Sequence, residues 1–438
     1  MYQTVSDQAR RGARVVAVVA LVLVAGVPAV SRAAAPVPTF KVDSTVDAPD
    51  GAVGDGKCQS TADGARCTLR AAVQEADAVL LGPALVVVPP GRYRLTVPPA
   101  PGEDVAGSAE AVDGAAGDLV IGHAVTVRGA GAGRTVLDGA GLDRVFAIGN
   151  EGDAHLSDLT ITGGDPSHRG TTQAISLGGA ILNNGAVTLD RVALIGNRAD
   201  GGGGLFSVPG TSPVIRNSLI ANNRAYSGGG LRLDSGATIV NTTITGNSLM
   251  PLPPPAQALP ARPFPTLFAL LVDEGSGWGG GIDHRGGDDV VILNATITGN
   301  HAIKGGGGLA TGQGYAPLSP SVALGTMRLQ NTIVAGNSST AGERGCHVKE
   351  QVIESLGHNL SSDRSCSLTA SNDRPGTDPR LGRLAPNGGP TWTQALLSGS
   401  PALDAAAGCP ATDQRGVARP QGRRCDIGAY ERVHGRTP

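Results

Sequence analysis

The stretch Ser227–Asn247 reads SGGGLRLDSGATIVNTTITGN and combines two signals of opposite meaning. Consecutive glycines are typical of a flexible linker, whereas ATIVNTTIT is rich in β-branched residues and is typical of a strand. A phosphate-binding loop is a third interpretation, but no Gly-Lys-Ser/Thr follows the glycines and no helix is expected after them. The rest of the sequence decides between a linker and one unit of a regular scaffold.

The stretch is one copy of a repeat. Six nine-residue segments share an aliphatic residue at the first position and another at the sixth. They begin at Leu156, Leu189, Ile215, Ile239, Ile292 and Leu329. Asparagine closes five of them, at Asn197, Asn223, Asn247, Asn300 and Asn337, and Gly164 closes the other. Four copies also have asparagine third, at Asn217, Asn241, Asn294 and Asn331.

A second recurring segment, glycine-rich and followed by an aliphatic residue, gives the length of the repeat. Those aliphatic residues are Ile181, Leu205, Leu231, Ile282 and Leu309, at steps of 24, 26, 51 and 27 residues. The step of 51 contains a Pro-rich insertion, residues 248–277, which breaks the pattern. Repeats of this length indicate a stacked architecture in which each unit buries its apolar face against its neighbours.

The units predict an all-β fold. They contain short runs of Val, Ile, Leu and Thr between Gly and Asn, without helical periodicity. Roughly 24 residues at about 3.3 Å each make three short strands around a triangular section. We therefore predict a right-handed parallel β-helix, a solenoid with about 24–27 residues per coil. The first and sixth aliphatic residues then line the interior, and stacked asparagines bond to one another and to turn backbone.

The first 35 residues are typical of an export signal. Arg10, Arg11 and Arg14 precede the apolar run Val15–Val27, which is too short to span a bilayer comfortably, and small residues follow it. An uncleaved anchor is the alternative. We expect a secreted protein with no stable membrane insertion after cleavage, and association with the cell surface is a second location consistent with the sequence.

Charge and cysteine content agree with export. The formal net charge is −2 without a long basic run, so nucleic acid is not an expected partner, and we expect a monomer. Six cysteines allow fifteen pairings. The simplest joins sequence neighbours: Cys58 with Cys67, Cys346 with Cys366, and Cys409 with Cys425. A metal site is the competing interpretation, but no C-x-x-C or nearby His pair supports it.

The two ends have a different pattern, as expected for caps over exposed strand edges. Residues 67–79 place Leu69, Ala72, Val73 and Ala76 on one helical face and predict a short N-terminal capping helix. The last 60 residues are dense in Pro and Gly and predict an irregular cap closed by a disulfide. We expect Asp413, Arg415 and Asp426 to form a structural network there. 

Both ends resemble known families. Residues 42–78 resemble the CSLREA domain of secreted bacterial proteins, whose Cys-Ser-Leu-Arg-Glu-Ala core stands here as Cys67-Thr68-Leu69-Arg70-Ala71-Ala72. The repeats are similar to the β-helix family that includes pectate lyases and many surface proteins. NGGPTWTQALLSGSPALDAA and CDIGAYE are similar to the choice-of-anchor Q region. The resemblance implies an exported β-helix, often tethered, and fixes no activity. The sequence ends in RVHGRTP without a sorting motif, which favours secretion without an anchor.

These patterns divide the chain into four predicted parts. They are a signal peptide at 1–35, a CSLREA-like cap at 36–82, the β-helix at 83–345, and the last coils with a choice-of-anchor Q-like cap at 346–438.

Side chains suited to ligand binding or catalysis are most concentrated after the Pro-rich insertion, in DEGSGWGGGIDHRGGDD, residues 273–289. The candidate glycan or calcium contacts are Trp278, Asp283, Asp288 and Asp289. Carboxylate oxygens suit Ca²⁺, a perturbed Arg285 could act as a base, and the indole could stack on a sugar. The competing interpretation is that the charges form a solvated corner, and we favour it. No residue is therefore predicted to be catalytic, and no cofactor other than this candidate calcium is expected.

Two functions follow. The first is a non-catalytic scaffold for adhesion or glycan binding, with extracellular polysaccharide or the cell surface as partner. The alternative is a pectate-lyase-like polysaccharide lyase, or a hydrolase, acting on acidic polysaccharide in a groove on the β-helix. Asn-Thr-Asp, Gly-His-Gly, Arg-Ile-Lys and Gly-x-Ser-x-Gly motifs are absent, and aromatic residues make up only 3% of the chain. The fold hosts both roles. We favour the non-catalytic scaffold because these catalytic motifs are absent and aromatic residues are scarce.

Overall fold

The computed structural model describes residues 36–80, 82–99, 114–166, 176–251, 276–312, 325–342, 344–349 and 352–433. The predicted export signal, residues 1–35, and most of the Pro-rich insertion lie outside these ranges. Residues Val37–Pro438 form one compact unit. Across the described ranges, no helix has both the length and the apolar character needed to cross a membrane.

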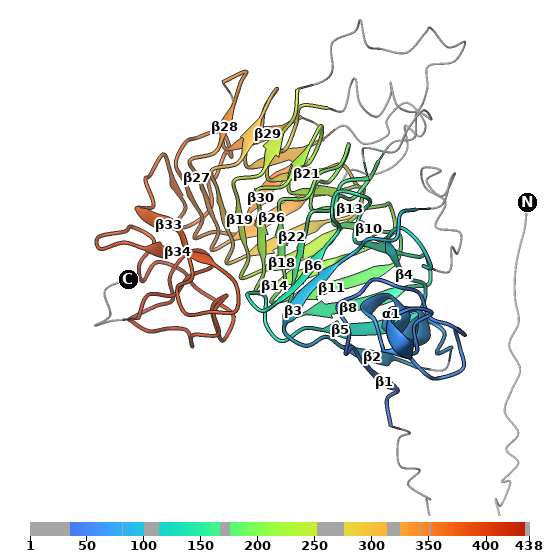
Figure 1. The fold of residues 1–438 in the computed structure, drawn as a ribbon. Helices are drawn as coiled ribbons and strands as arrows, with labels where there is room; N and C mark the ends of the chain where they lie inside the picture. Colours follow the sequence, from blue (N-terminus) through green and yellow to red (C-terminus); the bar gives the residue numbers. More distant parts are fainter. Residues whose placement is uncertain are drawn as a thin grey trace, which may run out of the picture. The chain divides into compact units, whose positions relative to one another are not determined.

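Three long sheets and one short sheet make up the coils of the unit (Figure 1). Sheet 1 contains, in spatial order, β1 (Thr39–Lys41), β2 (Ala84–Val87), β5 (Ala124–Arg128), β8 (Asp153–Ser157), β11 (Ala186–Asp190), β14 (Val214–Arg216), β18 (Ala237–Val240), β22 (Val290–Leu293), β26 (Met327–Gln330) and β30 (Ile353–Ser355). Sheet 2 contains β3 (Gly91–Arg94), β6 (Thr135–Asp138), β9 (Thr160–Thr162), β12 (Ala193–Ile195), β15 (Leu219–Ala221), β19 (Thr243–Thr245), β23 (Thr296–Thr298), β27 (Ile333–Ala335), β31 (Leu360–Ser361) and β32 (Arg374–Pro375).

Sheet 3 contains β4 (Leu119–Ile121), β7 (Phe146–Ile148), β10 (Ile181–Asn183), β13 (Leu205–Ser207), β17 (Leu231–Leu233), β21 (Ile282–His284), β25 (Leu309–Thr311) and β29 (Cys346–Val348). The short sheet 4 contains β16 (Arg224–Ala225), β20 (Ser248–Leu249), β24 (His301–Ala302) and β28 (Ser338–Ser339). The strands of these four sheets pair in parallel, and each central coil adds one strand to each long sheet.

This is the predicted parallel β-helix. Leu205 pairs with Leu231, and Leu231 pairs with Ile282, so the step of 51 residues is one coil with an insertion. The first strand already lies inside the N-terminal segment, because β1 pairs with β2.

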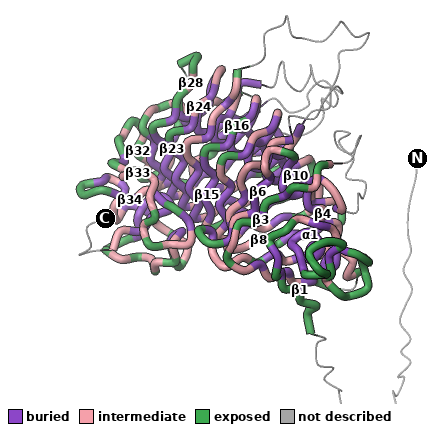
Figure 2. Tube along the Cα trace, in the orientation of Figure 1, coloured by how far each residue is buried: buried purple, intermediate pink, exposed green. Residues whose placement is uncertain are grey.

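The predicted aliphatic positions form the core. The first and sixth residues of all six segments are at most 1% exposed, and purple buried positions recur along the coils in Figure 2. Complete burial of such a side chain stabilises the fold by about 1.5–3 kcal/mol, as an upper estimate. The coil interior is therefore held by a column of matching aliphatic residues.

The two sets of asparagines have different roles. The closing asparagines are buried and form a continuous ladder, in which each side-chain amide donates to the next side-chain oxygen at 2.9–3.0 Å. The third-position asparagines instead adopt the left-handed conformation, with φ between 47° and 53°. Glycine takes that conformation just before most closing asparagines, as at Gly196 and Gly246. Ladder and bend are thus made by different residues of each repeat.

Helix α1 (Leu69–Asp77) contacts β1, β2, β4 and β5 at the N-terminal end of the coils. The Thr68 hydroxyl caps it by accepting from the Ala71 N–H at 3.1 Å. The predicted apolar face is buried, and so is Arg70, whose guanidinium pairs with both carboxylate oxygens of Asp47 at 2.8 and 3.1 Å. The same guanidinium donates to three backbone carbonyls. Arg70 therefore fastens the helix to the first coils.

The C-terminal segment packs along the flank of the coils. Its hairpin, β33 (Leu381–Ala385) with β34 (Thr393–Leu396), belongs to an apolar cluster that includes Ile333 of β27. The Asn241 side chain donates to the Thr412 carbonyl at 2.9 Å, 171 residues away. The Gly428 N–H donates to the Asn331 carbonyl at 2.8 Å. This cap consequently holds several coils together from one side.

Polar and covalent links stabilise the cap. Asp413 accepts from the Arg415 guanidinium at 2.8 Å, and Arg419 pairs with Glu431 at 3.2 Å, all four side chains being nearly or fully buried. Asp426 accepts from two backbone N–H groups. Three disulfides join Cys58 to Cys67, Cys346 to Cys366 and Cys409 to Cys425, the pairs that sequence proximity favours.

Candidate functional site

Asp283 of β21 and Arg285, which follows the strand, are buried and paired with each other. Asp283 is at the middle of the strand, between the inward-facing Ile282 and His284, so its position points out of the coil. Its carboxylate accepts from Arg285 at 2.6 Å, and the two side chains are only 1% and 5% exposed. The Ser227 hydroxyl donates to the same oxygen at 2.6 Å. Asp283 and Arg285 therefore engage each other in the layer that lies on the outer side of sheet 3.

The preceding coil adds a second ion pair. Arg232, in register with Asp283, donates to Asp234 at 3.1 Å, and both side chains are almost completely buried. The Arg232 guanidinium also lies 5.2 Å from the centre of the Phe206 ring. A buried ion pair is tolerated when its charges are matched and hydrogen-bonded, and each of these two arginines pairs with one aspartate.

Trp278 lies before β21 and outside the strands of sheet 3, in a single parallel bridge with Gly305. Its indole stacks on the His347 ring with 3.9 Å between centroids and 25° between planes. The Lys304 amino group is 6.0 Å from the indole centroid. One face of the half-buried indole is thus occupied by a protein ring, which reduces the surface it can offer to a sugar.

Asp288 and Asp289 are exposed and lie just before β22, in the turn that leads to sheet 1. Asp289 accepts from the Thr326 N–H at 2.9 Å and pairs with Arg328. These hydrogen bonds, from Thr326 first and Arg328 second, lower the pKa of Asp289. Among the residues that the structure describes, no group of three or more His, Cys, Asp or Glu side chains is arranged to hold a metal ion. The predicted contacts therefore fall into separate places: the pair on β21, the Trp278 stack and the turn.

His284 points into the coil. Its Nδ1 lies 3.2 Å from the Leu233 carbonyl, and burial lowers the pKa of the imidazole. A ring that is completely buried in the interior has no direct route to a ligand on the outer surface.

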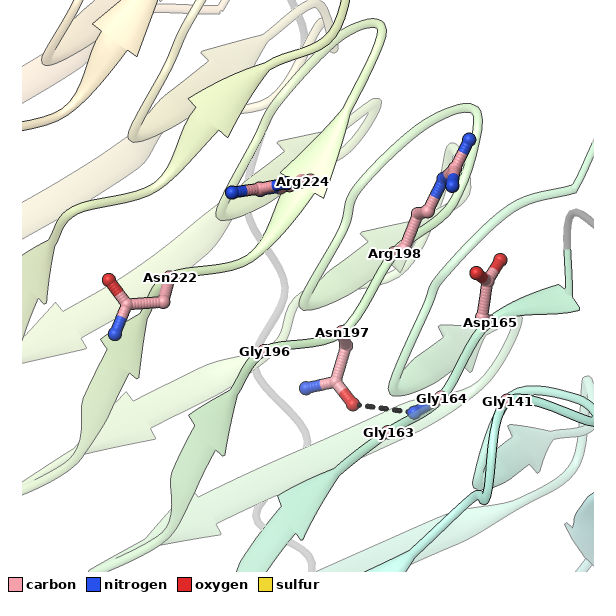
Figure 3. Close-up of a pocket in the computed structure, with 9 residues that line it drawn as sticks. All are labelled: Gly141, Gly163, Gly164, Asp165, Gly196, Asn197, Arg198, Asn222 and Arg224. Atoms are coloured by element: carbon pink, nitrogen blue, oxygen red, sulfur yellow. Dashed lines mark hydrogen bonds between the residues drawn. The ribbon is translucent and has the colours of Figure 1, made fainter.

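A groove that the sequence analysis missed lies at the bend between sheet 2 and sheet 4. Its volume is about 400 Å³. It is lined by Gly141, Gly163, Gly164, Asp165, Gly196, Asn197, Arg198, Asn222 and Arg224 (Figure 3). Glycines form much of its floor, and Asp165, Arg198 and Arg224 come from three successive coils, since the Arg198 N–H donates to the Gly164 carbonyl and the Arg224 N–H to the Asn197 carbonyl.

The groove arginines have no acidic partner. Neither the Arg198 nor the Arg224 guanidinium forms an ion pair or hydrogen bond with a described residue, and the Arg198 Nε is buried without an acceptor. Asp200 is close enough for its pKa to be lowered by Arg198, yet burial is the larger effect and raises that pKa overall. Arg224 is exposed. Two cationic groups therefore face the groove with their donors unoccupied.

A sequence signal for this pair exists. Asn-Arg-Ala follows the aliphatic ladder in two consecutive copies, at Asn197–Ala199 and Asn223–Ala225. Residues at the same place in successive coils stack, so a repeated arginine predicts a cationic row.

A second groove of about 550 Å³ lies between sheet 2 and the C-terminal cap. Thr245 and Thr298 line it from the coils, with 3.2 Å between their hydroxyl oxygens, and Gln394 of β34 lines it from the cap. The Thr298 hydroxyl already donates to the Gln394 side-chain oxygen. We therefore assign this groove to cap docking.

Comparison with known proteins assigns no function to the chain. No family model matches the chain, and no curated protein matches it. Among solved structures, pectate lyase Pel9A is 14% identical over 90% of this chain and 96% of that chain, with a TM-score of 0.37. The A-module of the Azotobacter vinelandii mannuronan C-5 epimerase AlgE4 is 16% identical over 74% of this chain and 85% of that chain, with a TM-score of 0.27. The resemblance of the ends to the CSLREA and choice-of-anchor Q families remains a prediction.

Proposed function

We propose that the protein is an exported, non-catalytic β-helix that binds an extracellular glycan, with a CSLREA-like segment at its N-terminal end and a choice-of-anchor Q-like segment at its C-terminal end. One observation carries the non-catalytic part. Asp283 and Arg285, the strongest candidates for lyase chemistry, are joined to each other at 2.6 Å in a buried layer.

A general base must come within hydrogen-bond reach of the proton that it removes. The Arg285 guanidinium donates to Asp283 and to Ser227, and its side chain is only 5% exposed. Substrate contact would require this pair to separate and leave Asp283 buried without its cation, which is unfavourable. The pair supports a structural role, which agrees with a scaffold.

Export is supported by chemistry that needs an oxidising compartment. The described residues contain three disulfides and no free cysteine, and stable disulfides are typical of proteins outside the cytoplasm. The asparagine ladder and the cap along the flank provide the rigidity that a binding scaffold requires.

The test combines binding and turnover on one panel. The full chain, after export, is incubated with polyuronates, sulfated glycans and neutral glucans, with and without Ca²⁺. Gel retardation by immobilised polymer measures binding, and unsaturated or reducing products measure cleavage. The proposal predicts retardation by at least one polymer without product.

Arg285→Lys, which keeps the charge, and Arg285→Ala serve as paired variants, with far-UV circular dichroism as the control for folding. Product formation that both folded variants abolish would contradict the proposal and establish the lyase alternative. Failure of every polymer to retard the protein would also contradict it.

A further inference from the structure

We infer that the ligand is an acidic glycan that lies along the coil-stacking direction in the groove at Arg198 and Arg224, with one carboxylate on each guanidinium. This inference rests on the proposed function, since it names the ligand and the place of that binding.

The geometry of stacked coils sets the spacing of the backbone from which the two arginines extend. Arg198 and Arg224 occupy equivalent, bridged positions in adjacent coils, and adjacent strands lie about 4.8 Å apart. Their side chains extend in different directions from this backbone (Figure 3). A polymer that lies along the stacking direction and carries a carboxylate on every sugar offers repeated anionic groups to both side chains.

The unoccupied donors define the charge of the ligand. A guanidinium presents N–H groups in a planar fork that matches a carboxylate. Burial of a donor without an acceptor costs free energy, and the Arg198 Nε is such a donor. An anionic group in the groove would supply acceptors to both arginines.

The remaining groove groups favour a sugar over a phosphate polymer. Asp165 lines the same groove, and its carboxylate accepts hydrogen bonds but repels anions. Sugar hydroxyls donate to carboxylates, whereas phosphodiesters have no donor. Asn222 offers an exposed amide at the rim, and Gly163 and Gly196 leave the floor free of side chains. A polymer with both carboxylates and hydroxyls matches all of these groups.

Affinity electrophoresis with polyuronate tests the assignment on the full chain. The variants are Arg198→Ala, Arg224→Ala and the double variant. Arg128→Ala is the matched control, because Arg128 is an exposed strand arginine of sheet 1 that forms no ion pair with another described residue. We expect the apparent Kd to rise about fivefold or more for each groove arginine, as for loss of one charge-assisted contact, and to change less than about twofold for the control.

Gly196→Asn tests the groove without changing charge. Gly196 has φ of 67°, and Asn222 fills the equivalent place in the next coil with φ of 55°, so the backbone accommodates asparagine. A Cβ at Gly196 meets only the Thr162 hydroxyl, at 3.8 Å. The added side chain should weaken polyuronate binding while the thermal midpoint stays close to that of the unmodified protein.

The outcomes separate the two proposals. If polyuronate binds but the folded double variant and Gly196→Asn bind as tightly as the unmodified protein, the groove assignment is wrong while the proposed function stands. Binding of neutral glucan alone would likewise overturn the acidic ligand. Polyphosphate is the competing anion: if it binds as tightly as polyuronate with the same arginine dependence, the ligand is not a glycan. Arg198→Gln replaces Arg198→Ala if the latter does not fold.

Discussion

Replacement of Asn247 by alanine tests the asparagine ladder. Asn247 is completely buried at the centre of the ladder. Its side-chain oxygen accepts from the backbone N–H and the side-chain amide of Asn223, both at 3.0 Å. Its amide donates to the Ile220 carbonyl and to the Asn300 side-chain oxygen, both at 2.9 Å. Alanine removes these four hydrogen bonds together.

The expected loss follows from these contacts. The Asn223 side chain keeps its bond to the Leu194 carbonyl, and the Asn300 oxygen keeps the N–H of residue 247. The Asn223 backbone N–H, however, is left buried without an acceptor. At about 1 kcal/mol for each hydrogen bond and more for a buried orphaned donor, the free energy of unfolding falls by roughly 3–5 kcal/mol.

Guanidinium unfolding followed by circular dichroism measures this loss, provided that unfolding is a single transition. Thr238→Ala is the matched control, because Thr238 lies on β18 of the same coil and is only half-buried. We expect the control to lose less than about 1 kcal/mol. If Asn247→Ala is no more destabilising than Thr238→Ala, the ladder does not hold the coils together and the reasoning is refuted.

Three further changes test the two ends of the chain. Arg70→Met should lower the free energy of unfolding by about 3–5 kcal/mol, because Asp47 stays near the first coils without its buried cation; an unchanged denaturation midpoint would show that Arg70 does not fasten the helix. Replacement of Cys409 and Cys425 by serine should cost about 2–4 kcal/mol, measured by thermal unfolding, and equal midpoints would contradict a stabilising cross-link. Burial raises the pKa of Asp426 from 3.8 to about 6, so the folded state holds the proton more tightly than the unfolded chain. The free energy of unfolding of the unmodified protein, minus that of Asp426→Asn, should therefore be most positive below about pH 4 and fall as pH rises to about 6. An increase in this quantity over the same range would contradict the assignment.

The repeated part of the fold was predictable from local sequence. Each coil places the same residue type at the same position, so the roles of Ile239 and Ile244 follow from the period alone. The ladder of closing asparagines follows in the same way, since stacked amides both donate and accept. The left-handed bend was not separated from the ladder, because asparagine suits both and only the backbone angles distinguish Asn241 from Asn247.

Two contacts outside the repeat were not predictable. The bond between Asn241 and Thr412 spans 171 residues and has no counterpart in other coils. The helical pattern also did not predict the burial of Arg70, because a charged residue next to an apolar face is usually exposed. Here Asp47 and backbone carbonyls surround the guanidinium.

The sequence placed the candidate contacts in one stretch but could not show which of them are buried. A concentration of charged residues in 273–289 was correctly noticed, but the sequence could not show that Asp283 points into a buried layer while Asp288 lies on an exposed turn. Burial on the outer side of a sheet depends on what covers that sheet. The repeated arginines were detectable, since Arg198 and Arg224 follow equivalent asparagines.

A crystal structure of the protein with a bound oligouronate tests the central claim most directly. We predict an intact oligomer in the groove, with carboxylates on Arg198 and Arg224 and the Asp283–Arg285 pair unchanged. An oligomer that instead lies against sheet 3, with Arg285 released from Asp283 to contact the sugar, would contradict the account.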